Sequence, residues 1–108
     1  MNNPINELEN IGSYDILIVE DELAIRMSLV DLMEISGFQV RSAENGLEGV
    51  RKVQEKTPDL IISDVMMPEL DGYGFLEEIR ANKETTLIPF IFLTAKVELE
   101  SKLQGMEL

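Results

Sequence analysis

Apolar and polar residues follow two alternating periods along this chain. Short blocks typical of strands are each followed by a longer segment with apolar residues three and four positions apart, which predicts a helix. The expected strands are residues 16–19, 38–43, 60–63 and 90–93. The expected helices are residues 23–36, a segment from Leu47 to just before Thr57, a segment with Phe75, Leu76 and Ile79 facing inward, and residues 97–105. The pattern is therefore a strand–helix unit repeated four times.

The apolar patterns of two expected strands predict different surroundings for them. Residues 16–19 are apolar without interruption, as in a strand covered on both faces, whereas residues 38–43 include polar positions between apolar ones, as in an edge strand. The apolar positions of the first helix are Ile25, Leu29, Leu32 and Met33. Gly37 supplies the stop of that helix.

Strands separated by helices run parallel and are joined by right-handed crossovers, so the pattern predicts a doubly wound α/β sheet. In such sheets the functional site lies outside the carboxyl ends of the strands, where the winding reverses. Glu20 and Asp21 follow the first expected strand, Asp64 follows the third, and Thr94 follows the fourth. In a sheet of strand order 2-1-3-4, the carboxylates of Glu20, Asp21 and Asp64 converge.

The composition is that of one soluble domain. The chain has 108 residues, 44% of them hydrophobic, and no apolar run long enough to cross a membrane, so no membrane partner is expected. It has no cysteine, and its start lacks the basic flank and apolar core of a secretory signal, which predicts a cytoplasmic location. Residues 1–13 are polar with little periodicity, so we expect a flexible N-terminal extension before a domain over residues 14–108.

Charge narrows the chemistry and the partners. The 21 acidic and 9 basic residues give a formal net charge of -12, which opposes direct binding to nucleic acid. The chain has no histidine, so it provides neither an imidazole general base nor a phosphate-carrying imidazole.

Converging carboxylates predict a bound cation. Two unit charges about 4 Å apart repel by roughly 4 kcal/mol at an effective dielectric constant near 20, so the cluster destabilises the fold unless one group keeps a proton or a cation lies between them. Carboxylate oxygens on short side chains suit a hard ion, and a small number of ligands favours Mg²⁺ over Ca²⁺. We therefore expect Glu20, Asp21 and Asp64 to form part of a Mg²⁺ site.

Each acid also has a purely structural interpretation. Asp21 is a preferred N-cap residue type, and Glu22 suits the positive first turn of the following helix. Asp64 could be an Asx-turn residue, Asp71 a cap or turn residue, and Thr94 a strand-end hydroxyl without a further task. Their joint occurrence at the ends of different strands favours the functional interpretation.

The motifs VEDE, SDVMMPELDG and LTAK resemble those of the receiver domain of two-component response regulators, over residues 15–108. Arg26, five residues after Asp21, also falls where that family often has an arginine. The resemblance implies a flavodoxin-like receiver fold in which Asp64 accepts a phosphoryl group from a sensor histidine kinase or a phosphotransfer protein.

The resemblance also implies roles for the neighbouring residues. Mg²⁺ would be held by Glu20, Asp21, Asp64 and the backbone carbonyl of Met66. Thr94 would hydrogen-bond the phosphoryl oxygens, and the small Ala95 would leave them accessible. Met66 and Lys96 occupy positions that tune the lifetime of the phosphorylated state, and their structural alternatives are a loop methionine and a solvated lysine.

The sequence departs from the family at its C-terminus. Family members continue into a fifth strand, which has a lysine that reaches the site and an aromatic switch residue, and then into a fifth helix, none of which has a counterpart here. We expect a truncated receiver domain whose fourth strand is an open edge. Such a domain forms a homodimer, pairs with a partner that completes the sheet, or is only partly ordered when alone. The alternative function is therefore an interaction or assembly module that is not productively phosphorylated.

Two other classes fit poorly. A phosphatase of the haloacid dehalogenase type needs a second aspartate two residues after its nucleophile, where this chain has Met66. An EF-hand loop needs alternating Asp or Asn ligands around a central glycine, which are missing. We expect a phosphoacceptor domain rather than an enzyme.

Overall fold

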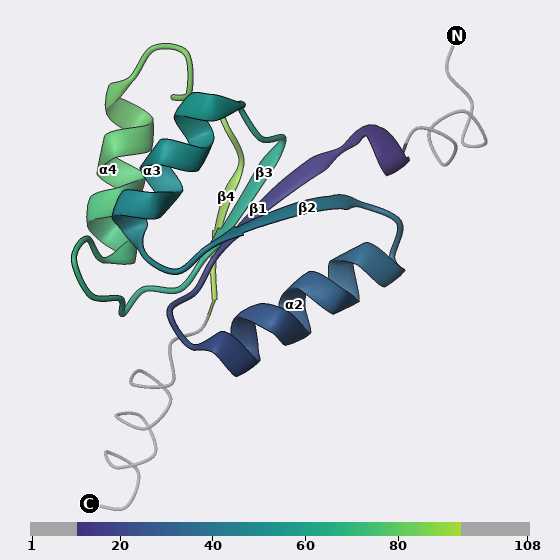
Figure 1. Cartoon of the computed structure of the whole chain (residues 1–108). Coiled ribbons are helices and arrows are strands. Elements are labelled where there is room, and N and C mark those ends of the chain that lie inside the picture. The colour runs from purple at the N-terminus through teal and green to yellow at the C-terminus, as the bar shows by residue number, and fades with distance from the viewer. Residues whose placement is uncertain (1–10, 94–108) are drawn as a thin grey trace, which may run out of the picture.

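Strands and helices alternate along residues 11–93, the part of the chain that the computed structural model describes (Figure 1). A 3-10 turn, η1 (Ile11–Ser13), precedes the first strand. The elements that follow are β1 (Asp15–Val19), α2 (Leu23–Ile35), β2 (Gln39–Ala43), α3 (Gly46–Glu55), β3 (Leu60–Ser63), α4 (Gly72–Ala81) and β4 (Phe90–Phe92). The alternation predicted from apolar spacing is confirmed as far as β4, and the helix expected over residues 97–105 lies outside the described residues.

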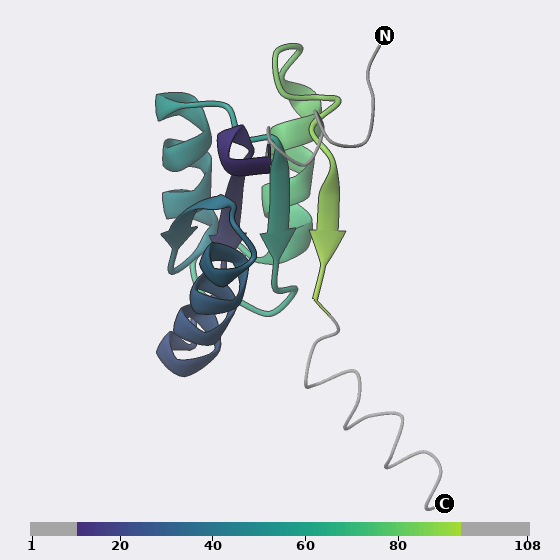
Figure 2. The same cartoon turned by 90° about the vertical axis from the view of Figure 1, so that its right-hand side faces the viewer.

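The strands form one parallel sheet in the order β2-β1-β3-β4 (Figure 2). This is the predicted order: β2 is an edge strand, and the winding reverses between β1 and β3. The register pairs Val19 of β1 with Ala43 of β2 and with Ser63 of β3. The next residues, Glu20 and Asp64, therefore leave the sheet at the same edge.

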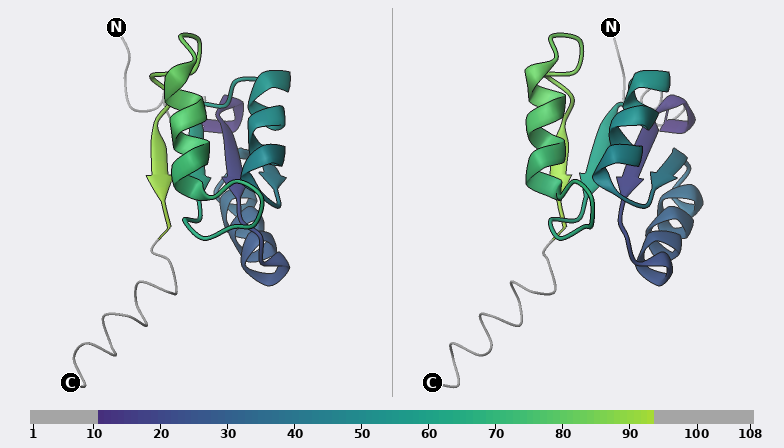
Figure 3. Two further views of the ribbon diagram at one scale, coloured as in Figure 1. Left: turned by 90° about the vertical axis from the view of Figure 1, so that its left-hand side faces the viewer. Right: turned by 60° about the vertical axis from the view of Figure 1, so that its left-hand side comes forward.

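Helices cover both faces of the sheet, with α2 on one face and α3 and α4 on the other (Figures 1 and 3). Side chains of β1 alternate between two hydrophobic clusters: Leu17 and Val19 face α3 and α4, whereas Ile16 and Ile18 face α2. All four are at most 3% exposed, which explains why the strand is apolar without interruption. No helix among residues 11–93 is long and apolar enough to cross a membrane.

Aromatic rings connect α4 to β4. The buried Phe75 of α4 lies 5.4 Å from Phe90, which lies 5.1 Å from Phe92, and Phe92 in turn lies 5.2 Å from Tyr73 at the start of α4, all between ring centroids. Tilted and edge-on pairs at these distances add to the burial of the rings themselves. The contacts hold the end of β4 near the carboxyl edge of the sheet.

The packing of α2 differs from its sequence pattern at one position. Leu29, Val30 and Met33 pack onto the sheet, but Leu32, which the spacing places among the apolar positions, is 55% exposed. At about 100° per residue, Leu29, Met33 and Val30 fall within one arc of about 100° around the helix axis, and Leu32 lies outside it, about 110° from its centre. Gly37 ends the helix as predicted, with a φ of 100° that glycine adopts without strain.

A buried ion pair joins three elements at the amino end of β1. The side chain of Asp15 is 3% exposed, and its Oδ2 accepts a hydrogen bond of 2.6 Å from Nη2 of Arg41 on β2. Arg41 also donates to the carbonyl oxygens of Lys52, at 2.8 Å, and Lys56, at 2.7 Å, at the end of α3. The guanidinium therefore pairs a buried charge and satisfies helix-end carbonyls at once.

Replacing Arg41 by methionine tests this arrangement. The Arg41→Met variant leaves the Asp15 carboxylate buried without its cation, and we expect a loss of about 3 kcal/mol in the free energy of unfolding, measured by urea denaturation. Arg51→Met is the control, because the ion pair of Arg51 with Glu48 lies on the surface and contributes little. Equal denaturation midpoints for the two variants would contradict the role given to Arg41.

Candidate functional site

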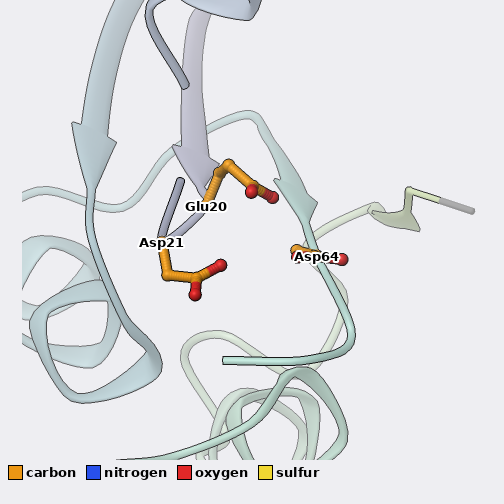
Figure 4. Close-up of side chains that lie close together, drawn as sticks. All are labelled: Glu20, Asp21 and Asp64. Carbon is orange, nitrogen blue, oxygen red and sulfur yellow. The ribbon is translucent and has the colours of Figure 1, made fainter. Parts of the chain in front are cut away.

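Three carboxylates meet at the carboxyl edge of the sheet, where the winding reverses (Figure 4). Glu20 and Asp21 follow β1, Asp64 follows β3, and one oxygen from each carboxylate lies within 4.8 Å of the others. Backbone hydrogen bonds extend the sheet to these residues: the Glu20 N–H donates to Ala43 O at 3.0 Å, and the Asp64 N–H donates to Val19 O at 2.9 Å. The predicted convergence of the acids is confirmed.

The structure tests the purely structural interpretation of each acid. Glu22, not Asp21, is the N-cap of α2, and its side chain makes no capping hydrogen bond, so the capping interpretation of Asp21 is wrong. Oδ1 of Asp64 accepts a 2.8 Å bond from the N–H of Val65, the next residue, whereas an Asx-turn bonds two residues on. Asp71 does cap α4 through a 2.8 Å bond from the Gly74 N–H, as predicted.

Arg26 and Gly72 brace the backbone of the site. Nη1 of Arg26 donates to the carbonyl oxygens of Glu20, at 2.8 Å, and Asp21, at 3.4 Å. Gly72, the first residue of α4, packs so tightly that a Cβ would lie 2.2 Å from the carbonyl oxygen of Asp64. The family resemblance pointed to Arg26, and the sequence indicated a cap or turn at Asp71, just before Gly72, but neither contact of Arg26 or Gly72 was predicted.

The pKa of Glu20 is raised from 4.5 to about 7. Burial is the main cause, since Glu20 is 2% exposed, and the hydrogen bond that its protonated form makes with Asp64 adds to it. The N–H of Glu22, bonded to Oε1 of Glu20 at 3.2 Å, lowers the pKa by less than burial raises it, and the negative charges of Asp64 and Asp21 add smaller increases. Glu20 therefore keeps its proton below about pH 7 when no cation is bound.

The raised pKa predicts how stability depends on pH. The folded chain holds the Glu20 proton more tightly than the unfolded chain, so its contribution is present in full below pH 4.5 and is lost as pH rises through about 7. Glu20→Gln stays neutral throughout. In chelator we expect this variant to be more stable than the wild type at pH 8, by at most about 3 kcal/mol, and similar to it at pH 4.5.

Urea denaturation at the two pH values measures this difference, with Asp31→Asn, an exposed acid of α2, as the control. A Glu20→Gln chain that gains nothing at pH 8 would show that the three carboxylates tolerate full ionisation together.

Of the remaining predicted site residues, only Met66 lies within the described part of the chain. Met66 lies in the loop after Asp64 and is 54% exposed, and its carbonyl stays a predicted ligand. Thr94, Ala95 and Lys96 lie outside the described residues, so their roles stay predictions. The chain leads toward the site at that point, because the N–H of Leu93 donates to Ser63 O at 2.9 Å, next to Asp64.

Family comparison agrees with this geometry. The family model described as the response regulator receiver domain matches residues 16–108. The chain belongs to this family. Over residues 11–93, the sheet order, the helices on its two faces and the converging acids at the switch point are thus those of a flavodoxin-like receiver domain in two-component signalling.

Curated relatives of this receiver domain include proteins named as probable transcriptional regulators. The chain is 41% identical over 104 residues to "Probable transcriptional regulator ycf27" of Cyanidium caldarium, covering 96% of this chain and 41% of that protein. It is 36% identical over 96 residues to "Probable transcriptional regulator ycf29" of Pyropia yezoensis, covering 89% of this chain and 43% of that protein. The chain thus spans about two fifths of the length of these relatives.

Solved structures show the same fold. The N-terminal domain of a response regulator receiver protein from Methanoculleus marisnigri JR1 superposes with a TM-score of 0.74 at 34% identity, over 85% of this chain and 76% of that one. Chemotaxis protein CheY4 of Vibrio cholerae superposes with a TM-score of 0.74 at 31% identity, over 87% of this chain and 78% of that one.

Proposed function

We propose that this receiver domain is switched by phosphorylation of Asp64, with a sensor histidine kinase or a phosphotransfer protein as donor and Mg²⁺ as cofactor. The observation that carries the proposal is the convergence of Glu20, Asp21 and Asp64 within 4.8 Å at the switch point of the sheet. Family membership supports a phospho-accepting role.

The donor set suits Mg²⁺. All three side chains offer carboxylate oxygens, which hard cations prefer, and the carbonyl of Met66 is proposed as a further oxygen ligand. The buried Glu20 carboxyl needs a positive partner when it ionises near pH 7, and a divalent cation supplies it. Bound Mg²⁺ would neutralise negative charge on the carboxylates and on the incoming phosphoryl group.

Asp64 acts as the nucleophile in this proposal. Its carboxylate oxygen forms a bond to phosphorus while the bond between phosphorus and the donor imidazole nitrogen breaks, and the electron pair stays on that nitrogen. The product is an acyl phosphate. Later attack by water restores the Asp64 carboxylate and releases inorganic phosphate, which ends the signal.

Catalysis of this reaction depends on positioning and on charge neutralisation, because a carboxylate is a weak nucleophile toward an anionic phosphoryl group. Val65 N–H holds Oδ1 of Asp64, and Gly72 packs against its carbonyl, so the carboxylate has a defined direction. Thr94 is proposed to hydrogen-bond the phosphoryl oxygens, and Ala95 to leave room for them. Met66 is proposed to shield the acyl phosphate from water.

We propose that phosphorylation shifts the populations of two surface conformations of the domain, and that another domain or protein binds one of them. Two relatives are named as transcriptional regulators, whereas another similar structure, at 36% identity and a TM-score of 0.71, is the receiver domain of a signal transduction histidine kinase from Syntrophus aciditrophicus. Receiver domains thus serve both kinds of protein. A cytoplasmic location is part of the proposal.

Phosphorylation by acetyl phosphate tests the central claim. With Mg²⁺ present, we expect intact-protein mass spectrometry to show the gain of one phosphoryl group in the wild type and none in Asp64→Asn. Chelation of Mg²⁺ should lower the rate by at least about 100-fold, because charge neutralisation at the transferring group is then lost. Asp31→Asn, which changes an exposed acid of α2, should behave as the wild type.

A wild type that is folded but unmodified would contradict the proposal, and modification that persists in Asp64→Asn would contradict the choice of residue. Retention of cooperative unfolding by Asp64→Asn separates loss of the acceptor from loss of the fold.

A second candidate is an interaction or assembly module with a receiver fold. Exposed apolar side chains on the α2 side of the sheet favour it: Ile91 of β4 is 52% exposed and Met27 of α2 is 55% exposed. Light scattering at micromolar concentration should then give a dimer, and Ile91→Asn should shift it toward monomer. A monomer at all concentrations would remove this candidate.

A further inference from the structure

We propose that Arg26 is a positioning residue for the acid pair: its hydrogen bonds to the carbonyl oxygens of Glu20 and Asp21 hold both carboxylates where they meet Asp64, and thereby set the affinity for Mg²⁺. The inference rests on the proposed function, since it concerns the cation of the same site. The contacts that carry it are the 2.8 Å bond from Nη1 to Glu20 O and the 3.4 Å bond from Nη1 to Asp21 O.

The two acids are anchored very differently by the sheet. Glu20 continues the β1 ladder through its N–H bond to Ala43 O, so its main chain is set by strand pairing. Asp21 comes after that last rung and before α2, in a bend. In the described part of the chain, the bond from Arg26 is the hydrogen bond that reaches the main chain of Asp21. The direction of the Asp21 carboxylate therefore depends on Arg26 more than that of Glu20 does.

Arg26 also belongs to the first turn of α2. Glu22 occupies the N-cap position, and its own N–H donates to Oε1 of Glu20 at 3.2 Å. The N–H of Arg26 donates to Glu22 O at 2.9 Å in the first helical turn, while its guanidinium reaches back to the two preceding carbonyls. One residue thus joins the first turn of α2 to the loop that presents the acids.

The choice of acceptor suits a cation site. Both bonds of Arg26 end on main-chain oxygens, so neither uses a carboxylate oxygen of the acid pair. A guanidinium paired directly with those carboxylates would compete with Mg²⁺ for them. From its position on the carbonyls, Arg26 orients the ligands without occupying them, as groups outside a metal's own ligand set do elsewhere.

A second arginine provides a matched control. Arg26 lines a polar groove of about 370 Å³ beside the acids, and the residues that share it are Ser42, Ala43, Glu44, Glu48, Arg51 and Lys52. Arg51 has the same charge in the same groove, but its guanidinium bonds to the carboxylate of Glu48. Arg51→Met thus removes a positive charge near the site without touching the backbone of the acid pair.

Loss of the charge and loss of the positioning contacts are expected to change the Mg²⁺ dissociation constant in opposite directions. Removing a positive charge near a cation site tightens cation binding, because the Coulomb repulsion between that charge and the cation is lost. Loss of the two hydrogen bonds instead weakens it, and the loss of groups that orient metal ligands typically costs 10–100-fold in affinity. We expect positioning to dominate, so that Arg26→Met weakens Mg²⁺ binding by about 10-fold while Arg51→Met leaves it unchanged or tighter.

The experiment is an Mg²⁺ titration of the chain at pH 8 and constant ionic strength, followed by amide NMR. Arg26→Lys keeps the charge but replaces the planar guanidinium, and Arg26→Gln loses the charge but keeps an N–H donor. We expect both to weaken Mg²⁺ binding by less than Arg26→Met does. If Arg26→Met does not fold, the Lys and Gln variants test the proposal in its place, because charge alone predicts no change for Lys and tighter binding for Gln.

A kinetic measurement separates positioning from general damage. In the acetyl phosphate reaction, we expect Arg26→Met to raise the half-saturating Mg²⁺ concentration by about 10-fold, with the same rate at saturating Mg²⁺. A lower saturating rate with an unchanged half-saturating concentration would overturn the inference, as would Mg²⁺ binding by Arg26→Met that equals or exceeds the wild type. Absence of Mg²⁺ binding by the wild type would instead overturn the proposed function.

Discussion

Repulsion among carboxylates at one edge of the sheet is the constraint on which the rest of this structure depends. Glu20 is buried, and Asp21 and Asp64 lie close enough for one oxygen of each to fall within 4.8 Å of the others. Such a cluster is tolerated only with a proton or a cation between its members. Burial and the acidic neighbours raise the pKa of Glu20 to about 7, so the fold favours its protonated form over the free carboxylate.

A buried acid lies at each end of β1, and the nearby arginine bonds to a different part of each one. At the amino end, Asp15 is paired with Arg41, which also binds carbonyl oxygens at the end of α3. At the carboxyl end, Arg26 bonds to the main chain of Glu20 and leaves its carboxylate without an arginine partner. Loss of Arg41 would leave the Asp15 charge buried and unpaired, which is costly, whereas the buried Glu20 carboxyl with a raised pKa marks a candidate functional site.

The core and the acid cluster occupy different parts of this small domain. The side chains that face the core from the sheet lie in two apolar clusters. Glycine at position 72 lets α4 approach the carbonyl of Asp64, and Asp71 caps that helix, so the loop after Asp64 is tied to a rigid element. In the proposed switch, a change of charge at Asp64 would act on a backbone that is already held in place.

The sequence by itself determined the order of strands and helices, the parallel sheet and the residues that end its strands. It did so because burial on both faces of β1 requires an uninterrupted apolar block, and because parallel strands require helical crossovers. Its motifs also identified Glu20, Asp21 and Asp64, since short polar residues at strand ends have few structural reasons to coincide.

Only the tertiary structure decided which of the local interpretations holds. Asp21 is of a residue type that often caps helices, yet the N-cap is Glu22, because the backbone stays extended through Glu22 and becomes helical only at Leu23. Leu32 fits an apolar helical pattern but faces solvent, because the sheet contacts a narrower stripe of α2. The burial of Glu20 arises from segments that are far apart in the sequence, so no local spacing could encode it. Arg26 lies only six residues after Glu20, but the oxygens that its guanidinium reaches depend on the path of the bend between β1 and α2.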